Sequence, residues 1–242
     1  MELLFIILLP LLGACLPPLC ERFGRNICAM SAAVGPLLAL GLLVSYLPAL
    51  FEWQVFFFHQ SWLPQLGLDL SLRLDGLGMM FALLIVGIGL LVILYARYYL
   101  DDKDSLGRLY SLLQLFMMAM LGIVLADNIL LLIVFWELTS LSSFLLIGYW
   151  SHKSEARKGA RMALAVTGGG GLALFAGVLL VGHIAGSFEL TQVLAAGEQI
   201  GWGFQLQNPA VVAGLALLFT LIGLNLAGLF EFKQLVPGAL AT

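Results

Sequence analysis

Charged side chains are scarce in this chain of 242 residues. They make up 10% of the sequence, while hydrophobic residues make up 62%. In soluble domains, about 25% of the residues are charged and about 45–50% are apolar. Such an apolar composition excludes intrinsic disorder, and a net charge of −3 leaves no basic surface for nucleic acid. The three cysteines, Cys15, Cys20 and Cys28, lie in or beside apolar runs and do not indicate a disulfide scaffold. The composition therefore predicts a protein embedded in a lipid bilayer.

Motifs for metal, nucleophilic or phosphate chemistry are also missing. The three histidines, His59, His152 and His183, are far apart in sequence, and none lies at ligand spacing from another. No Gly-Lys-Ser or Gly-Lys-Thr follows the glycine run 168–171, so that run is not a phosphate loop. We therefore expect no cofactor and no metal site. The glycines favour close helix packing, and a flexible point beside an ion path is the alternative.

Seven apolar segments are long enough to cross about 30 Å of hydrocarbon. They span residues 3–20, 27–50, 76–96, 109–126, 129–150, 162–185 and 209–230. Backbone groups in lipid must be satisfied internally, so all seven are predicted to be helices. Pro10, Pro17 and Pro18 are expected to kink the first helix or end it early. The predicted fold is an all-α polytopic membrane protein, with residues 1–242 forming a single transmembrane domain.

Basic residues are concentrated in alternate connections between these spans. The connections after the first, third and fifth spans hold Arg22, Arg25, Arg97, Lys103, Arg108, Lys153, Arg157, Lys158 and Arg161. The connections after the second, fourth and sixth spans hold Arg73 alone. Because cytoplasmic loops retain positive charge, the N-terminus is predicted outside, and Lys233, which follows the seventh span, inside.

Two connections are predicted to have structure of their own on the outer side. Residues 68–75 alternate apolar and polar side chains, as a half-buried strand does. They are expected to pair with 55–58 through a turn over 61–67, which gives an external hairpin within the loop 51–75. Residues 187–200 are predicted to form a short amphipathic helix on the outer surface.

Glu137 is the one charged residue within the seven spans. An ionised carboxylate at membrane depth costs at least ~2.5–3.5 kcal/mol, and such residues mark ion or proton pathways by default. The alternative is a structural carboxylate paired with a cation on a neighbouring helix. Hydroxyl groups extend a polar arc from Glu137 along the helix, as an ion-path lining or as packing groups: Thr139, Ser140, Ser142 and Ser143. Asp75 and Asp127 are expected to cap the third and fifth spans.

The segment 135–150, FWELTSLSSFLLIGYW, resembles the large A subunit of the multisubunit Mrp-type cation/proton antiporters. Shorter stretches extend the likeness: RLDGL at 73–77, YYL at 98–100, and Thr167 with GGLA at 170–173. The resemblance runs from about residue 1 to 223, the N-terminal part of that subunit. The continuation TSLSS after Glu137 points to the Mrp subunit over its relatives in respiratory complex I.

The resemblance implies a subunit of a secondary transporter, not an enzyme, in a bacterial-type cell membrane. Proton movement would be coupled to sodium or another monovalent cation, and other membrane subunits of a hetero-oligomeric complex would be its partners. In the family, the glutamate matching Glu137 pairs with a lysine on a broken seventh helix. Here 223–230 reads GLNLAGLF, and Lys233 is the candidate for a displaced partner.

Three functions therefore remain open. The leading one is an antiporter subunit in which Glu137 accepts and releases a proton. The second keeps the fold and assigns the chain to proton pumping in a complex I-type or hydrogenase-type oxidoreductase. The third is a truncated, non-catalytic assembly subunit, because the family's A subunit continues far beyond Thr242.

Overall fold

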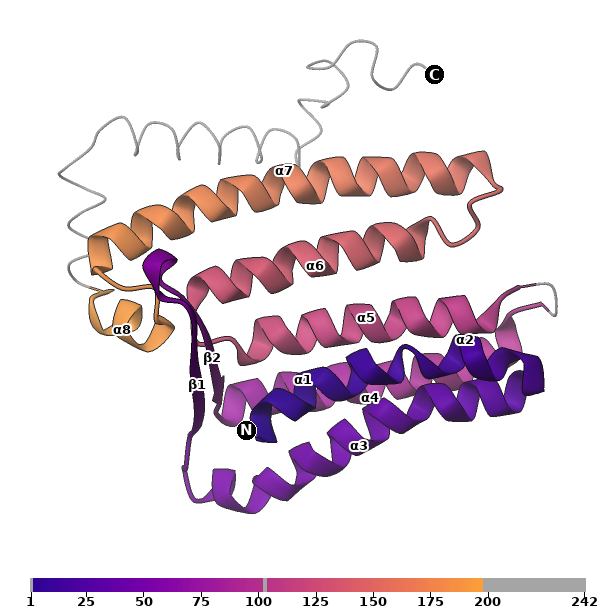
Figure 1. The fold of residues 1–242 in the computed structure, drawn as a ribbon, viewed down its shortest axis with the longest axis horizontal. Coiled ribbons are helices and arrows are strands. Elements are labelled where there is room, and N and C mark those ends of the chain that lie inside the picture. The colour runs from indigo at the N-terminus through magenta and orange to yellow at the C-terminus, as the bar shows by residue number, and fades with distance from the viewer. Residues whose placement is uncertain (1, 102–103, 198–242) are drawn as a thin grey trace, which may run out of the picture.

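A computed structural model describes residues 2–101 and 104–197. The long helices lie side by side, and the start of the chain, a two-stranded hairpin and a short last helix gather at one end (Figure 1). The elements in chain order are α1 (Glu2–Gly13), α2 (Leu16–Cys20), α3 (Arg25–Phe51), β1 (Phe56–Leu63), β2 (Leu68–Leu74), α4 (Gly76–Tyr99), α5 (Leu106–Leu125), α6 (Ile129–Ile147), α7 (Ser154–Ala185) and α8 (Leu190–Ala195).

Six helical segments in the described part of the chain are long and apolar enough to cross a membrane. They correspond to the first six predicted spans. The seventh predicted span, 209–230, lies outside the described residues. The chain is thus a multi-pass membrane protein with a predominantly helical fold.

The first span is divided, as its prolines predicted. Helix α1 ends at Gly13, and α2 begins at Leu16 with prolines in its first turn. Because Pro17 and Pro18 carry no N–H, the carbonyls of Gly13 and Ala14 lose their helical donors. The Ser111 hydroxyl of α5 donates to the Ala14 carbonyl at 2.6 Å. Pro10, by contrast, lies inside α1 without interrupting it.

Helix ends extend beyond or fall short of the apolar runs. Helix α7 begins at Ser154, eight residues before the predicted start at 162, and includes three of the four basic residues of that connection, while Lys153 precedes its first turn. Helix α6 ends at Ile147, and the Gly148 N–H caps it by donating to the Phe144 carbonyl at 3.0 Å. Helical backbone hydrogen bonds can continue beyond the apolar segment into the aqueous region. Hydropathy therefore marks the part of a helix that lies in the membrane and not the residues at which the helix begins and ends.

The hairpin separates an apolar face from a polar face. Its register pairs Phe56 with Leu74 and Phe58 with Leu72, and both leucines are fully buried in the main core, where β2 contacts α1, α4, α5 and α6. The alternate pairs, which include His59 with Ser71, carry polar groups on the other face. Strand β1 continues to Leu63, through residues expected to form the turn, because His59 and Ser61 keep the period-two pattern. The chain reverses instead at Pro64–Leu66 and Gly67, whose φ of 68° suits glycine.

Helix α8 is shorter than the amphipathic helix expected over 187–200. It runs from Leu190 to Ala195, and residues 198–200 lie outside the described part of the chain. Gly186 ends α7 with a φ of 72°, which turns the chain back toward the hairpin. Phe188 then packs against Gly67 and Gly182 so closely that a methyl group on either glycine would overlap its ring.

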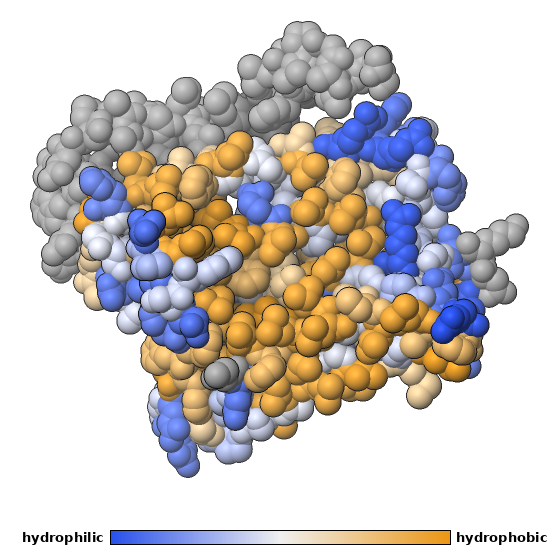
Figure 2. Space-filling view, in the orientation of Figure 1, coloured by the Kyte–Doolittle hydropathy of each residue, from blue (hydrophilic) through white to orange (hydrophobic). Residues whose placement is uncertain are grey.

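Polar side chains gather at the two ends of the helices. Figure 2 shows hydrophobic side chains over most of the middle of one face and hydrophilic ones toward its ends. At the end away from the hairpin, the buried Tyr149 follows α6, and its hydroxyl donates to the Ser105 carbonyl at 2.8 Å. Burial, together with the negative charges of Asp104 and Glu21, raises the pKa of Tyr149 to about 12, so it stays a neutral donor at physiological pH.

Candidate functional site

Glu137 lies in the middle of α6, and its carboxyl group is directed at α7. A Cβ atom built on Gly171 would overlap Oε1 of Glu137 and lie 3.0 Å from its Cδ. Gly171 is buried, whereas the three preceding glycines have open space where a Cβ would be. The glycine run therefore has one member, Gly171, whose missing side chain makes room for the carboxylate.

The Glu137 carboxylate has no polar partner among the described residues. Its side chain is exposed there, and no hydrogen bond or ion pair reaches it from residues 2–101 or 104–197. Lys233, the candidate partner, lies outside the described residues. Within this part of the chain, Glu137 thus packs closely against Gly171 without a hydrogen bond or an ion pair.

The hydroxyl arc mostly bonds its own helix. Thr139 donates to the Trp136 carbonyl at 2.7 Å, and Ser140 donates to the same carbonyl at 3.3 Å. Ser142 donates to the carbonyls one turn earlier, at 2.7 and 3.1 Å. Ser143 is half-buried, with no hydrogen bond among the described residues. These bonds are typical of hydroxyls in membrane helices, and none joins the arc to Glu137.

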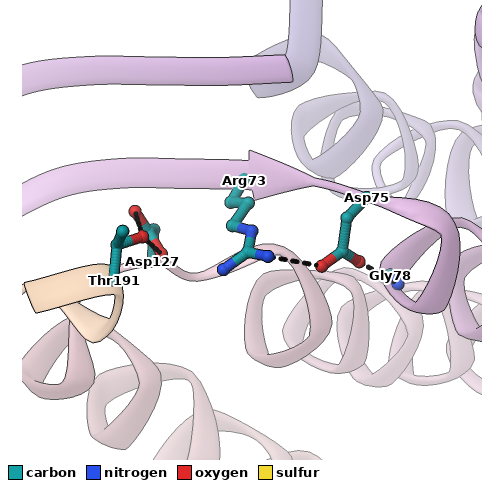
Figure 3. A network of polar contacts seen from close by, with 5 residues as sticks. All are labelled: Arg73, Asp75, Gly78, Asp127 and Thr191. Carbon is teal, nitrogen blue, oxygen red and sulfur yellow. Dashed lines mark hydrogen bonds and ion pairs between the residues drawn. The ribbon is translucent and has the colours of Figure 1, made fainter. Parts of the chain in front are cut away.

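Asp127 does not cap α6; the prediction was wrong by one residue. The side chain of Asn128 accepts the N–H groups of Leu130 at 3.0 Å and Leu131 at 3.1 Å. The Asp127 carboxylate instead accepts the Thr191 hydroxyl of α8, at 3.0 and 3.1 Å (Figure 3). Its N–H donates to the Ser71 carbonyl of β2, so Asp127 is turned away from the helix start by these tertiary contacts.

Asp75 caps α4, as the sequence predicted. Its Oδ1 accepts the Gly78 N–H at 2.8 Å, and its Oδ2 pairs with Arg73 at 2.9 Å (Figure 3). A pocket of about 250 Å³ lies beside this pair, with Leu190 of α8 in its wall. The RLDGL motif thus holds the end of β2 against the first turn of α4.

Asn128 joins three elements at the hairpin end. It is fully buried, and its Nδ2 donates to the Gly67 carbonyl at 2.9 Å and to Glu189 Oε1 at 3.0 Å. Nothing in the sequence favours Asn128 over Asp127 as the cap. Either residue type caps helices well, and only the fold shows which one points at α6.

Replacing Asn128 with alanine is expected to lower the free energy of unfolding by about 2–4 kcal/mol. The substitution removes the cap, worth about 1 kcal/mol, and leaves buried backbone groups without partners. Thermal unfolding of the purified chain in detergent measures the change. Ser105→Ala is the matched control, since that exposed cap accepts one N–H at 3.4 Å. Equal losses for the two variants would contradict the role assigned to Asn128.

One further polar group was not visible in the sequence. His59 of β1, Asp69 of β2 and Glu189, just before α8, have ligand atoms within 4.8 Å of one another. The first and last of these residues are separated by 130 positions in the chain, so spacing rules cannot relate them. Tertiary structure alone brings them together.

Two family models match the chain. One, described as NADH-ubiquinone oxidoreductase (complex I) chain 5 N-terminus, matches residues 62–110. The other, described as the transmembrane region of NADH:quinone oxidoreductase/Mrp antiporter, matches residues 126–232. Together they cover well over half of the chain. The chain belongs to this family of antiporter-like membrane subunits.

Two curated relatives of this antiporter-like chain are named as antiporter subunits of the A or A/B type. A probable K⁺/H⁺ antiporter A/B subunit of Rhizobium meliloti is 47% identical over 187 residues, which are 77% of this chain and 18% of the relative. An A1 subunit of a Na⁺/H⁺ antiporter from Staphylococcus aureus is 35% identical over 242 residues, which are 99% of this chain and 30% of the relative. The likeness to the Mrp A subunit is confirmed, and this chain spans less than a third of the length of these relatives.

Solved structures agree with this placement. The Mrp complex of a Dietzia species matches with a TM-score of 0.70 at 31% identity, over 80% of this chain and 21% of that chain. The membrane-bound sulfane sulfur reductase, an archaeal respiratory membrane complex, matches with a TM-score of 0.70 at 19% identity. It covers 83% of this chain and 41% of that chain, and shows the fold alone.

Proposed function

We propose that this chain is an ion-translocating membrane subunit of a multisubunit monovalent cation/proton antiporter. The observation that carries the proposal is the carboxylate of Glu137, in the middle of an apolar helix and against Gly171. An ionised carboxylate at that depth costs several kcal/mol unless it is paired or hydrated, and such residues mark ion or proton paths. No group among the described residues pairs with it, so it is available to exchange a proton.

Cation coupling in this proposal requires a charge that changes the proton affinity of Glu137. An approaching cation favours the ionised carboxylate and so releases its proton. Lys233 is the candidate for a fixed positive charge beside the path. To line the proposed path, the hydroxyls of Thr139, Ser140 and Ser142 must exchange their backbone acceptors for water. The Ser143 hydroxyl has no such bond to break among the described residues.

The proposed orientation places the hairpin end outside. The N-terminus, the hairpin and α8 share one end of the helices (Figure 1). The opposite end holds Arg22, Arg25 and the basic first turns of α7. The distribution of positive charge assigns that end to the cytoplasm. The membrane is proposed to be a bacterial plasma membrane.

Partner subunits are proposed to complete the transporter. The relatives named as antiporter A subunits are more than three times longer than this chain. The structural relative at 31% identity is part of an Mrp complex. Large apolar side chains are exposed along both α4 and α7 in the structure, where lipid or neighbouring membrane helices would cover them.

The proposal is tested in everted membrane vesicles that contain this chain with its native membrane partners. Addition of Na⁺ or K⁺ is expected to dissipate a preformed proton gradient, and vesicles prepared without this chain should lose that response. Both cations are assayed, because the relatives are named for one or the other. An unchanged response without the chain would reject the proposal.

A second candidate function is proton pumping driven by electron transfer. The match of residues 62–110 to the complex I chain 5 family model favours it. The same vesicles separate the two functions. If gradient formation during NADH oxidation depends on this chain, and cation-induced dissipation does not, the second function replaces the first.

A further inference from the structure

The polar face of the hairpin brings together an imidazole and two carboxylates. His59 pairs with Ser71, and Ser61 with Asp69, so His59 and Asp69 are diagonal neighbours on that face. Such diagonal positions are within reach of long side chains. Glu189 reaches the same face from the connection between α7 and α8, where it bridges to Asn128. All three ligand atoms lie within 4.8 Å of one another.

Ser71 connects His59 to Glu189 through hydrogen bonds. Its hydroxyl donates to Glu189 Oε1 at 3.0 Å, so it accepts from His59 Nδ1, which lies 2.8 Å away. In the neutral imidazole, a proton on Nδ1 leaves Nε2 with a lone pair that can bind a metal. This arrangement, in which the second ring nitrogen donates to a neighbouring group, is the usual support of a metal-bound histidine.

The second carboxylate oxygens are also left open. Glu189 Oε1 accepts hydrogen bonds from the Ser71 hydroxyl and from Asn128 Nδ2, while no hydrogen bond among the described residues reaches Oε2. Asp69 Oδ1 accepts the Trp62 N–H at 3.3 Å, which leaves Oδ2. Neither carboxylate forms an ion pair within residues 2–101 and 104–197. Two carboxylates thus lie close together without an ion pair to any described lysine or arginine, and Arg73 on the same face pairs with Asp75 instead.

A cavity adjoins the group and offers room for a further ligand. It has a volume of about 610 Å³, and Asp69, Glu189 and His183 are in its wall. His183 belongs to the last turn of α7. A metal ion held by three protein groups would keep a coordination position open toward this cavity, for water or for a fourth side chain.

We propose that His59, Asp69 and Glu189 bind a divalent transition-metal ion of the zinc type. One imidazole nitrogen and two carboxylate oxygens are ligands that Zn²⁺ takes at about 2.0–2.2 Å, which places ligand atoms about 3.3 Å apart in a tetrahedral site. The present separation, up to 4.8 Å, is wider than that value, so a bound ion would draw the three side chains closer together. The bound ion joins β1, β2 and the α7–α8 connection, and does not depend on the antiport proposed for Glu137.

The test uses the whole 242-residue chain, purified in detergent and stripped of metal with a chelator. Zn²⁺ affinity is measured by competition with a chromophoric chelator. One site per chain is expected, with an affinity at least tenfold weaker in His59→Ala, Asp69→Asn and Glu189→Gln. His152→Ala is the matched control, because that exposed histidine lies at the other end of the helices; it should bind as the unaltered chain does.

Two further measurements keep loss of folding apart from loss of binding. Glu189→Gln retains an oxygen that accepts Ser71 and Asn128, so its unfolding temperature without Zn²⁺ should match that of the unaltered chain. Zn²⁺ should then raise the unfolding temperature of the unaltered chain and not of this variant. X-ray absorption should show only nitrogen and oxygen ligands. Sulfur ligands, loss of binding in Cys15→Ser/Cys20→Ser, or equal affinities in His59→Ala and His152→Ala would each overturn the proposal.

Discussion

Glu137→Gln is expected to reduce cation-induced dissipation of a proton gradient at least tenfold at equal assembly. Glutamine has nearly the same shape as glutamate and still fits against Gly171, but it neither ionises nor accepts a proton near neutral pH. A proton path that passes through this side chain is therefore interrupted without a packing defect. The measurement is the response of everted vesicles to Na⁺ and to K⁺, normalised to the amount of assembled complex.

Glu155→Gln provides the control for this variant. It makes the same chemical change at an exposed position in the first turn of α7, outside the apolar segment. Exchange should be unchanged in that variant. If Glu137→Gln also transports normally, Glu137 is a structural residue, and the chain acts in assembly and not in ion movement.

Gly171→Ala is expected to reduce exchange at least tenfold while leaving the chain folded. The added methyl group would overlap Oε1 of Glu137, and the flexible carboxylate would move aside more easily than the helices would separate. A displacement of about 1 Å at a reacting group can cost about 10²-fold in rate. Alanine otherwise favours a helix over glycine by about 1 kcal/mol, so stability should not fall.

Gly170→Ala separates the carboxylate contact from a general effect on the helix. It makes the same substitution one residue earlier in α7, where a Cβ meets no described atom within 4 Å. Exchange in this variant should equal that of the unaltered chain. If both alanine variants lose exchange alike, flexibility of the glycine run matters, which was the alternative considered from the sequence.

Much of the helical fold follows from sequence because the bilayer imposes it. Apolar runs longer than about 17 residues have few alternatives to a membrane helix, and Pro17 and Pro18 interrupt the first one for a local reason. Boundaries were less predictable. Helix α7 begins eight residues before its apolar run, since its basic first turns are helical without being apolar.

Contacts between elements were beyond the reach of hydropathy. The sequence singled out Glu137 and the glycine run separately, yet only the packing of α6 on α7 shows that Gly171 is the glycine that faces the carboxylate. The same limit explains Asp127. Its neighbours Ser71 and Thr191, from β2 and α8, decide which of two adjacent cap residues turns toward α6.

The bonding at the hairpin end has a mechanical consequence. Backbone bridges join Leu72 to Ala126 and Asn128 to Glu189, so β2, the end of α5, the start of α6 and the α7–α8 connection are tied together. At the opposite end, α6 and α7 are joined by a short loop without strands. Any tilt of α6 relative to α7 would therefore pivot at the hairpin end of the helices. Glu137, halfway along α6, would then be displaced about half as far as the loop end of α6, so a large tilt moves the carboxylate a short distance.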